Sequence, residues 1–380
     1  MTTHWEERVK LARSSKFAAL AATGALALVG CSSGDSASDS GSPEAAGMIG
    51  GAECATGTIK ASGSSAQKNA MTEWINAYQT ACEGATIEYS PSGSSAGRAD
   101  FINNQVAFAG SDSAMEGDEL QQAAARCDAT PPINIPMVGG AIALTYNLEG
   151  VDNLVLTPDV TAKIFNNEIT NWNDPALAEV NPEVSLPDAP IAQFHRSDGS
   201  GTTDNFTQWM AATAPDAWPY EPGSDWTAKG GQGSKGSDGV AASVKSTPNS
   251  IGYVELSFVE TQGLKAASVD NGGGPVAPNA DTATAGLASA KVTPNPDAGE
   301  GDLTMEIDYA VQDSAAYPVL LLTYEIVCQS GNAADTLPLT QSFLTYTAST
   351  EGQSMLSGIG YVPLPGELET QVADAVNSLS

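Results

Sequence analysis

Apolar and polar positions follow two patterns that alternate over most of the chain. Residues 57–62 (GTIKAS), 85–90 (ATIEYS) and 106–112 (VAFAGSD) are short β-like runs, and we expect a strand at each. After the first run, apolar side chains recur at helical spacing, so that one helix face would carry Ala66, Ala70, Met71, Trp74 and Tyr78. Strands that alternate with helices predict an α/β fold.

Two longer apolar segments, 133–147 and 316–327, have the composition of buried strands. We expect the first to cross from one domain to another and the second to cross back. Two crossings predict two lobes with a cleft between them, where ligands commonly bind. Lobe I would then comprise residues 51–137 and 310–380, and lobe II residues 138–309.

The other segments have weaker patterns. Residues 230–239 (GGQGSKGSDG) are expected to be a flexible loop, because they lack the Gly-Lys-Ser/Thr order of a phosphate loop. Residues 266–302 are rich in Gly, Pro, Ala and Asp and are expected to be mostly loop with one short helix. The remaining expected elements are a helix and a turn (158–175), a strand (189–196), a helix and a strand (236–256), and helices in the tail (337–349 and 366–380).

The N-terminus has the layout of a targeting segment. A basic stretch, 8–16, precedes an apolar stretch, 17–30, that is too short to span a bilayer comfortably but fits a signal peptide. It ends in Leu28-Val29-Gly30-Cys31, which resembles a bacterial lipobox, so we expect residues 1–30 to be a lipoprotein signal peptide and Cys31 to be lipidated. The alternative is an ordinary signal peptide with a chance Cys. Residues 31–50 are rich in Ser, Gly and Asp and are expected to form a flexible tether.

The composition limits the classes of partner. The 380 residues carry 45 Asp and Glu against 15 Lys and Arg, for a formal net charge of −30. No basic patch of useful size can be built from so few cations, so we expect no nucleic-acid partner. Two His residues and scattered Cys residues argue against a His- or Cys-based metal site, and we expect neither metal nor cofactor.

Lipidation of Cys31 would leave four cysteines for an exported protein, which predicts two disulfides with three alternative pairings. Cys82 and Cys127 each close a helical pattern. The preferred pairing is therefore Cys82 with Cys127 and Cys54 with Cys328.

Three strand-to-helix junctions combine Gly with hydroxyl residues. A helix N-terminus offers unpaired backbone N–H groups and the positive end of a dipole, while Gly admits a ligand and Ser or Thr adds a donor. Each junction taken alone also fits an ordinary N-cap. Together with Arg196, the three predict an anion site: Gly63-Ser64-Ser65-Ala66, Gly93-Ser94-Ser95-Ala96-Gly97 and Gly199-Ser200-Gly201-Thr202.

A serine hydrolase is the catalytic alternative, because Ser200 lies near His195 and Asp198. The G-x-S-x-G elbow is not met, since Asp198 stands where the first Gly should be. Triad partners also normally come from distant segments of the chain. We therefore expect no catalytic residues and no enzyme activity.

Four segments resemble one known family in order and approximate spacing. They are SGSSAGRADFINNQVAFAGSD, FNNEITNWNDP, FHRSDGSGTTDNFTQWM and GSDGVAASVKSTPNSIGYVEL. These segments are similar to the PstS family, the phosphate-binding lipoproteins and periplasmic proteins of bacterial ABC phosphate importers. The resemblance runs from about residue 57 to the C-terminus. It implies a two-lobed, type II periplasmic-binding-protein fold that closes around one phosphate.

The resemblance also implies the phosphate contacts. The family's R-x-D-G-S-G-T motif matches residues 196–202, with Asp198 as the partner that orients Arg196. The family usually has an aromatic residue where this chain has Ala66, but that contact is a backbone N–H, which Ala66 can supply. The implied contacts are Ser65, Ala66, Ser94, Asp112, Arg196, Ser200, Gly201 and Thr202.

The function implied by the resemblance is capture of inorganic phosphate outside the cytoplasmic membrane and its delivery to the permease subunits of an ABC importer. We expect a monomer held on the membrane by its lipid anchor. The first alternative is a binding protein for another oxyanion, such as sulfate or molybdate. Asp112 argues against it, because its carboxylate would repel an oxyanion that is fully deprotonated. A phosphate-ester hydrolase and an adhesin without a ligand are weaker alternatives. The sequence lacks the metal ligands or the nucleophile that such a hydrolase would use. An adhesin without a ligand would leave the three junctions unexplained.

Overall fold

The structure is a computed structural model that describes residues 47–380, which lie within one compact unit, Ala45–Ser380. The predicted signal peptide, the predicted lipidation site Cys31 and most of the predicted tether lie outside the described residues. From residue 47 onward, no helix has the length and apolar character needed to cross a membrane. Strand β1 (Met48–Ile49) pairs with β2 (Ala52–Glu53), and we therefore propose that the tether ends before residue 48 and not at residue 50.

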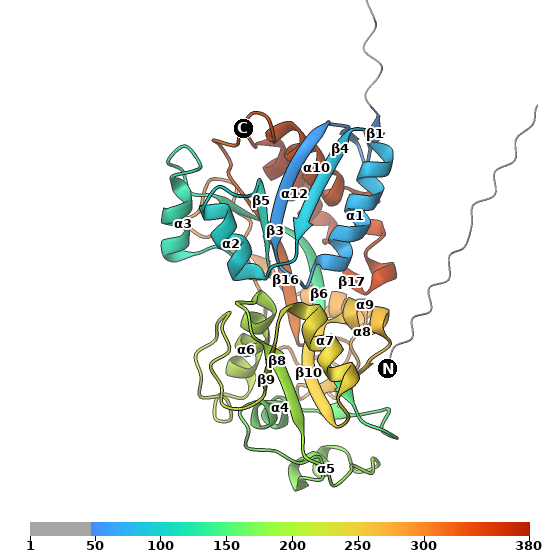
Figure 1. Ribbon diagram of the computed structural model, residues 1–380. Helices are drawn as coiled ribbons and strands as arrows, with labels where there is room; N and C mark the ends of the chain where they lie inside the picture. Colours follow the sequence, from blue (N-terminus) through green and yellow to red (C-terminus); the bar gives the residue numbers. More distant parts are fainter. Residues whose placement is uncertain (1–46) are drawn as a thin grey trace, which may run out of the picture. The chain divides into compact units, whose positions relative to one another are not determined.

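A ten-stranded sheet connects the two lobes (Figure 1). Its order is β4-β3-β5-β16-β6-β10-β8-β9, and β11 and β17 also pair with β6. Strands β3, β4 and β5 are parallel, as are β8, β9 and β10, whereas β6 and β16 are antiparallel to their neighbours. The bounds are β3 Gly57–Gly63, β4 Ala85–Ser90, β5 Phe108–Ser111, β6 Ile133–Asn147, β8 Ala192–Arg196, β9 Gln232–Ser234, β10 Ser250–Glu255, β11 Lys265–Ala266, β16 Leu320–Val327 and β17 Tyr361–Val362.

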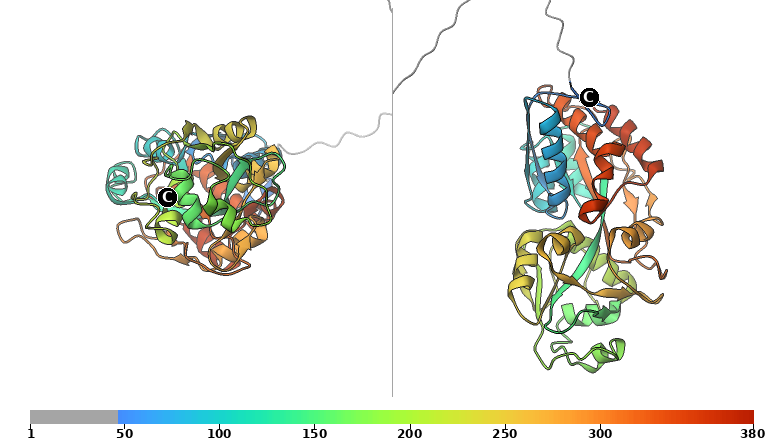
Figure 2. Two further views of the ribbon diagram at one scale, coloured as in Figure 1. Left: turned by 90° about the horizontal axis from the view of Figure 1, so that it is seen from below. Right: turned by 90° about the vertical axis from the view of Figure 1, so that its right-hand side faces the viewer.

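Strand β6 belongs to both lobes. Its residues 133–141 pair with β16, and its residues 142–147 pair with β10. Every residue of β6 except Asn147 is buried, which explains why its sequence is a continuous apolar run and not an alternating one. The crossing expected at 133–147 is confirmed, and β16 is the return strand; the right view of Figure 2 follows β6 from one lobe into the other.

Helices pack on the strands of each lobe. In α1, the residues Ala70, Met71, Trp74 and Tyr78 are buried, so the predicted apolar face is confirmed. The Trp74 indole N–H donates to the Gly352 carbonyl at 2.8 Å, which fixes α1 against the C-terminal part of lobe I. Lobe I carries α1 Lys68–Ala81, α2 Ser94–Ile102, α3 Gly117–Ala124, α10 Leu337–Ala348, α11 Thr350–Ser354, η1 Ser357–Ile359 and α12 Gly366–Asn377. Lobe II carries α4 Pro158–Phe165, α5 Pro175–Val180, α6 Gly201–Thr213, α7 Gly236–Ser246 and α8 Leu256–Gln262.

The segment after α8 contains short elements. The single helix expected within residues 266–302 is present as α9, and it packs on β6 and β17. In this segment α9 spans Ala280–Leu287, and the other short strands are β12 Ser268–Asp270, β13 Pro275–Val276, β14 Lys291–Val292 and β15 Met305–Glu306. Strand β7 (Val155–Leu156), from earlier in the chain, pairs with β12.

Contacts of this segment bear on where lobe II ends. The Asp302 carboxylate accepts from the Asn134 backbone N–H and side-chain amide, both at 2.8 Å, at the start of β6. Asn134 lies in the part of β6 that pairs with β16, beside the lobe I strands. We therefore propose that lobe II ends before residue 280, earlier than the limit of 309 drawn from the sequence.

Residues 230–239 do not form the flexible loop expected from their glycine content. Strand β9 occupies Gln232–Ser234, and α7 begins at Gly236. Gly236 has φ +69°, a conformation that glycine adopts without strain and that turns the chain from β9 into α7. The prediction is wrong because the segment holds a strand and a helix start, with Gly236 at the tight turn between them.

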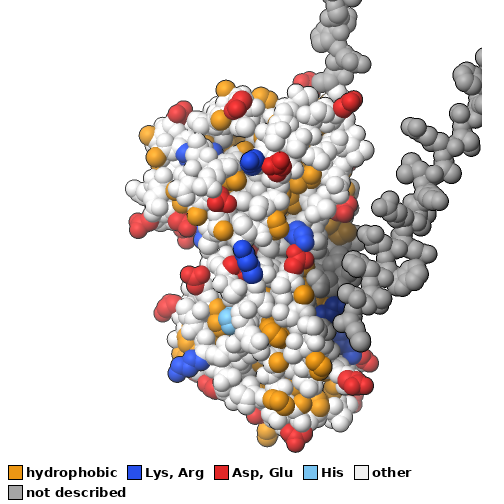
Figure 3. Space-filling view, in the orientation of Figure 1, with side chains coloured by type: hydrophobic (Ala, Val, Ile, Leu, Met, Phe, Trp, Pro, Cys, Tyr) orange, Lys and Arg blue, Asp and Glu red, His pale blue; other side chains and the backbone are white. Residues whose placement is uncertain are grey.

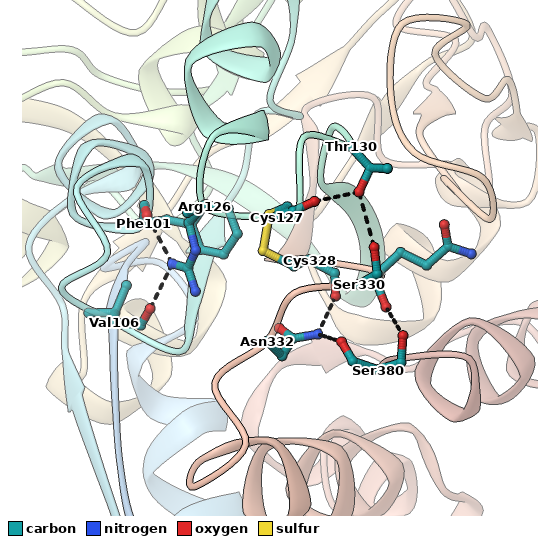
Figure 4. Close-up of a disulfide and its surroundings, with 10 residues drawn as sticks. Phe101, Val106, Arg126, Cys127, Thr130, Cys328, Ser330, Asn332 and Ser380 are labelled. Atoms are coloured by element: carbon teal, nitrogen blue, oxygen red, sulfur yellow. Dashed lines mark hydrogen bonds between the residues drawn. A yellow bond between two sulfur atoms is a disulfide. The ribbon is translucent and has the colours of Figure 1, made fainter.

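The two disulfides join Cys54 to Cys82 and Cys127 to Cys328, so the expected number is confirmed and the preferred pairing is wrong. Strand β3 carries the chain away from Cys54, and α1 returns it, which brings Cys82 back beside Cys54. Cys127 follows α3, and Cys328 directly follows β16, the antiparallel neighbour of β5. Figure 4 shows this second disulfide and the hydrogen bonds around it.

Candidate functional site

The predicted site residues lie where the two lobes face each other. Ser65 and Ala66 follow β3, Ser94 begins α2, and Asp112 follows β5 in lobe I. In lobe II, β8 ends at Arg196 and leads into α6. The structure buries all of them in one region: Ser65, Ala66, Ser94, Asp112, Arg196, Ser200, Gly201 and Thr202.

Asp112 lies at the centre of this region. Its carboxylate accepts from Thr202 at 3.1 Å and from Thr323 at 2.9 Å, and its backbone N–H donates to Ser94 Oγ at 3.2 Å. Burial raises the pKa of Asp112 above its ordinary value, while hydrogen bonds from Ser64 and Thr323 and the charge of Arg196 act in the opposite direction. The site therefore contains one acidic acceptor surrounded by donors.

Arg196 supplies the positive charge. Its Nε and Nη2 donate to Asp198 at 2.8 and 2.6 Å, and its side chain is 2% exposed. Asp198 also accepts the Gly236 backbone N–H at 3.0 Å, which ties it to the start of α7. Burial acts to raise the pKa of Asp198, but the hydrogen bond and charge of Arg196 outweigh it and hold the pKa below its usual value. The bidentate geometry fixes the plane of the guanidinium.

Glycines let the lobes approach closely around the site. Gly93 has φ +104°, and a Cβ there would lie 2.7 Å from Asp198 Oδ2. A Cβ on Gly201 would lie 2.6 Å from Asp112 Cβ. The Ser95 N–H donates across the lobes to the Gly199 carbonyl at 3.3 Å. Any side chain at Gly93 or Gly201 would therefore hold the lobes apart.

Ala66 and Ser200, like Thr202 and Ser94, also have protein partners in this structure. The Ala66 N–H donates to Ser64 Oγ at 3.0 Å, within its own turn. Ser200 Oγ accepts the Thr203 N–H at 3.2 Å and caps α6. The Ala66 N–H is thus engaged locally, and its role as a ligand donor stays a prediction. The hydroxyl of Ser200 can still donate while its oxygen accepts.

Sequence reasoning missed Ser237 and Thr323. Ser237 stands at the start of α7, 1% exposed, and its N–H donates to Ser65 Oγ at 3.0 Å. Its signal was present in the sequence, because Gly236-Ser237 is a fourth Gly-Ser pair at a helix start. Thr323 lies inside the apolar strand β16 and had no such signal.

Among residues 47–380, no group of three or more His, Cys, Asp or Glu side chains is arranged to hold a metal ion. A cavity of about 730 Å³ opens beside Asp112, lined by side chains that include Ser113, Asp204 and Tyr309. In Figure 3, acidic side chains are spread over both lobes of the visible face, and basic ones stand singly or in small groups. Two cations are buried near Asp112: Arg98, which pairs with Glu119 and donates to Ser111, and Arg196, which precedes the turn into α6.

Two lobes joined by crossing strands, with a buried polar site between them, define the class of solute-binding proteins. The sequence matches the PBP superfamily domain over residues 50–351. The phosphate-binding protein PstS3 of Mycobacterium bovis is 39% identical over 381 residues, covering 98% of this chain and 100% of the relative. The phosphate-binding protein PstS of Methanocaldococcus jannaschii is 32% identical, covering 84% of this chain and 86% of the relative. The chain therefore belongs to the PBP superfamily and, within it, to the PstS family.

Solved structures agree on the fold. A high affinity periplasmic phosphate-binding protein (PfluDING) bound with phosphate has a TM-score of 0.67 at 21% identity, covering 84% of this chain and 93% of that one. A putative phosphate ABC transporter substrate-binding protein from Clostridium perfringens has a TM-score of 0.59 at 21% identity, covering 81% of this chain and 100% of that one. The two-lobed type II fold expected from the sequence is confirmed.

Proposed function

We propose that this protein captures inorganic phosphate between its lobes, outside the cytoplasmic membrane, and delivers it to an ABC importer. The observation that carries the proposal is the burial of Arg196 in the same interlobe region as Asp112 and serine hydroxyls of both lobes, Ser65 and Ser200. The phosphate-binding relatives support it, since the chain spans nearly their whole length.

The chemistry of this region suits phosphate. Its oxygens would accept hydrogen bonds from Arg196, from hydroxyls whose protons are not donated to Asp112, such as those of Ser65 and Ser200, and from backbone N–H groups at the start of α6. Each bond to a charged group contributes about 1.5–3 kcal/mol. Near neutral pH phosphate keeps at least one proton, and its P–OH group could donate a hydrogen bond to the Asp112 carboxylate. The surface charge of −30 does not prevent this, because salt screens distant charges beyond about 8–10 Å.

Binding without turnover fits the surroundings of Ser200. The His195 ring stacks on Trp226 with centroids 4.7 Å apart, and its Nδ1 contacts the Arg196 carbonyl at 2.9 Å. Ser200 Oγ serves as the cap of α6. In this arrangement His195 Nδ1 and Ser200 Oγ each have a partner other than the other residue, which supports a binding protein over a hydrolase.

The proposal also includes a lipid anchor at Cys31, which lies outside the described residues, and an importer permease as the partner. Lipidation of Cys31 would hold a monomeric binding protein on the outer face of the membrane. The permease would recognise the form in which both lobes enclose the ligand, since only that form presents both lobes in a fixed relation.

Isothermal titration calorimetry of the purified protein tests the proposal. Bound phosphate is first removed by unfolding and refolding, and phosphate is then titrated at neutral pH. We expect saturable binding of one phosphate per chain with micromolar or tighter affinity. Sulfate is the second candidate, and tighter binding of sulfate than of phosphate would replace the proposal with it.

A further inference from the structure

Ser237 makes an interlobe contact with a predicted ligand residue. Its backbone N–H donates to Ser65 Oγ at 3.0 Å, and the two hydroxyl oxygens lie 3.1 Å apart. Both side chains are buried, with Ser65 3% and Ser237 1% exposed. The two residues are 172 positions apart in the sequence, and they come from opposite lobes.

The directions of these hydrogen bonds are constrained. A serine hydroxyl has one proton and can accept two hydrogen bonds. The Ser237 N–H already donates to Ser65 Oγ. When the Ser65 proton points to an anion, the bond between the hydroxyls can form only with Ser237 as donor. Ser65 then accepts two bonds and donates one outward, and linked hydrogen bonds of this kind strengthen one another.

This arrangement exists only when the lobes are together. In an open form, the Ser237 hydroxyl would turn to water and Ser65 would lose both donors. A ligand that takes the Ser65 proton therefore gains more from the closed form than from lobe I alone. Ser237 links acceptance of an anion in lobe I to the position of α7 in lobe II.

We propose that Ser237 is a positioning residue for phosphate capture, which sets Ser65 as a hydrogen-bond donor and couples ligand binding to closure of the lobes. The inference rests on the proposed function. Ser237 does not need to touch the phosphate, because it acts through Ser65.

A double-mutant cycle tests this role. Ser237→Ala keeps the N–H and removes the hydroxyl, so the affinity for phosphate should fall about 3- to 10-fold, the equivalent of one neutral hydrogen bond. Most of the loss should appear as faster dissociation in a radiolabelled phosphate chase. Ser65→Ala should also weaken binding. In the Ser65→Ala background, Ser237→Ala should cause no further loss.

Asp238→Asn is the matched control. Asp238 adjoins Ser237 and pairs with Lys68 across the lobes at 2.6 Å, but both side chains are partly exposed. Its effect should add to that of Ser65→Ala, because it does not act through that hydroxyl. Ser237→Gly also keeps the N–H and lacks the hydroxyl, and it must reproduce the loss in a folded protein.

Two outcomes would overturn the role of Ser237. One is wild-type affinity in both Ser237 variants, and the other is full additivity of Ser237→Ala with Ser65→Ala. Wild-type protein that does not bind phosphate would instead overturn the proposed function, so the two failures are distinguishable.

Discussion

Thr202 and Asp112 are joined across the two lobes, with the threonine hydroxyl donating to the Asp112 carboxylate at 3.1 Å. The contact places the first turn of α6 against the end of β5. On its other side, Asp112 accepts from Thr323 of the crossing strand β16. The Asp112 carboxylate of lobe I therefore contacts both lobe II and the strand that connects the lobes. A ligand bonded to Asp112 would change these contacts and so affect the equilibrium between open and closed lobes.

Arg196→Ala should weaken phosphate binding by about 2–5 kcal/mol, the range for truncating one partner of a buried charged pair. The variant removes a buried cation of the site and also leaves Asp198, whose side chain is 14% exposed, without its ion pair. Calorimetry at neutral pH measures the loss.

Lys245→Ala is the control for net charge, because Lys245 is an exposed cation on α7 of the same lobe. It should bind phosphate as the wild type does. Unchanged affinity in folded Arg196→Ala would remove Arg196 from the site.

Cys31→Ala should release the protein from membranes. The motif Leu28-Val29-Gly30-Cys31 predicts lipidation of that thiol, and without it no acyl chain would hold the protein. Fractionation of cells that express each form, followed by immunoblotting, measures the change. Processed Cys31→Ala protein that still sediments with membranes as wild type does would contradict the lipobox interpretation.

Glu325→Gln should stabilise the protein at alkaline pH. Glu325 is buried in β16, beside the Gln67 side chain. Burial raises the pKa of Glu325 from 4.5 to about 8, and the nearby Asp112 charge acts in the same direction as burial. Between these values the folded protein holds a proton that the unfolded chain has lost. The free energy of unfolding therefore falls as pH rises through this window, by at most about 1.4 kcal/mol per pH unit.

Urea denaturation of both proteins without phosphate, at pH 5 and pH 8, measures this effect. Glutamine carries no charge at either pH, so the variant should gain up to about 4 kcal/mol relative to wild type between the two pH values. Glu255 is also buried with a raised pKa, but it is present in both proteins and cancels in the comparison. A stability difference that is the same at both pH values would show that Glu325 is not protonated in the folded state.

The sequence predicted those features that depend on local order. The apolar face of α1, with Trp74 and Tyr78, was readable because helical spacing is a local property. The crossing strand β6 was readable because burial on both faces leaves a long apolar run. Each junction of Gly with Ser or Thr was also readable, because it is a pattern of adjacent residues.

Features that depend on which segments become neighbours were not readable. Cys127 pairs with Cys328 over a separation of 201 residues because β16 lies beside β5, and nothing near either cysteine encodes that neighbour. Ser237 carried a local signal, but its partner Ser65 is set by how the lobes meet. The engaged Ala66 N–H depends on the rotamer of Ser64, which no sequence pattern reports.

Asp112→Asn should narrow the preference for phosphate over sulfate. Competition titrations at neutral pH with both anions measure the ratio of affinities. Asp204→Asn is the matched control, because Asp204 lies in the first turn of α6, bonds to Ser113 across the lobes and lines the cavity beside Asp112. It removes one nearby negative charge without altering the Asp112 carboxylate, so the ratio should stay close to that of wild type.

The preference for phosphate over sulfate depends on whether the anion has a proton to donate to Asp112. Phosphate keeps at least one proton near neutral pH, and its P–OH can donate to the Asp112 carboxylate in a charge-assisted hydrogen bond. Sulfate has no proton, so two anions would face each other in a buried site, which costs more than the ~1–3 kcal/mol of an unsatisfied neutral group. Millimolar sulfate should therefore not displace micromolar phosphate from wild type. An amide at position 112 can donate to sulfate, so sulfate should compete measurably only in Asp112→Asn. Equal displacement by sulfate in wild type would favour a general oxyanion site.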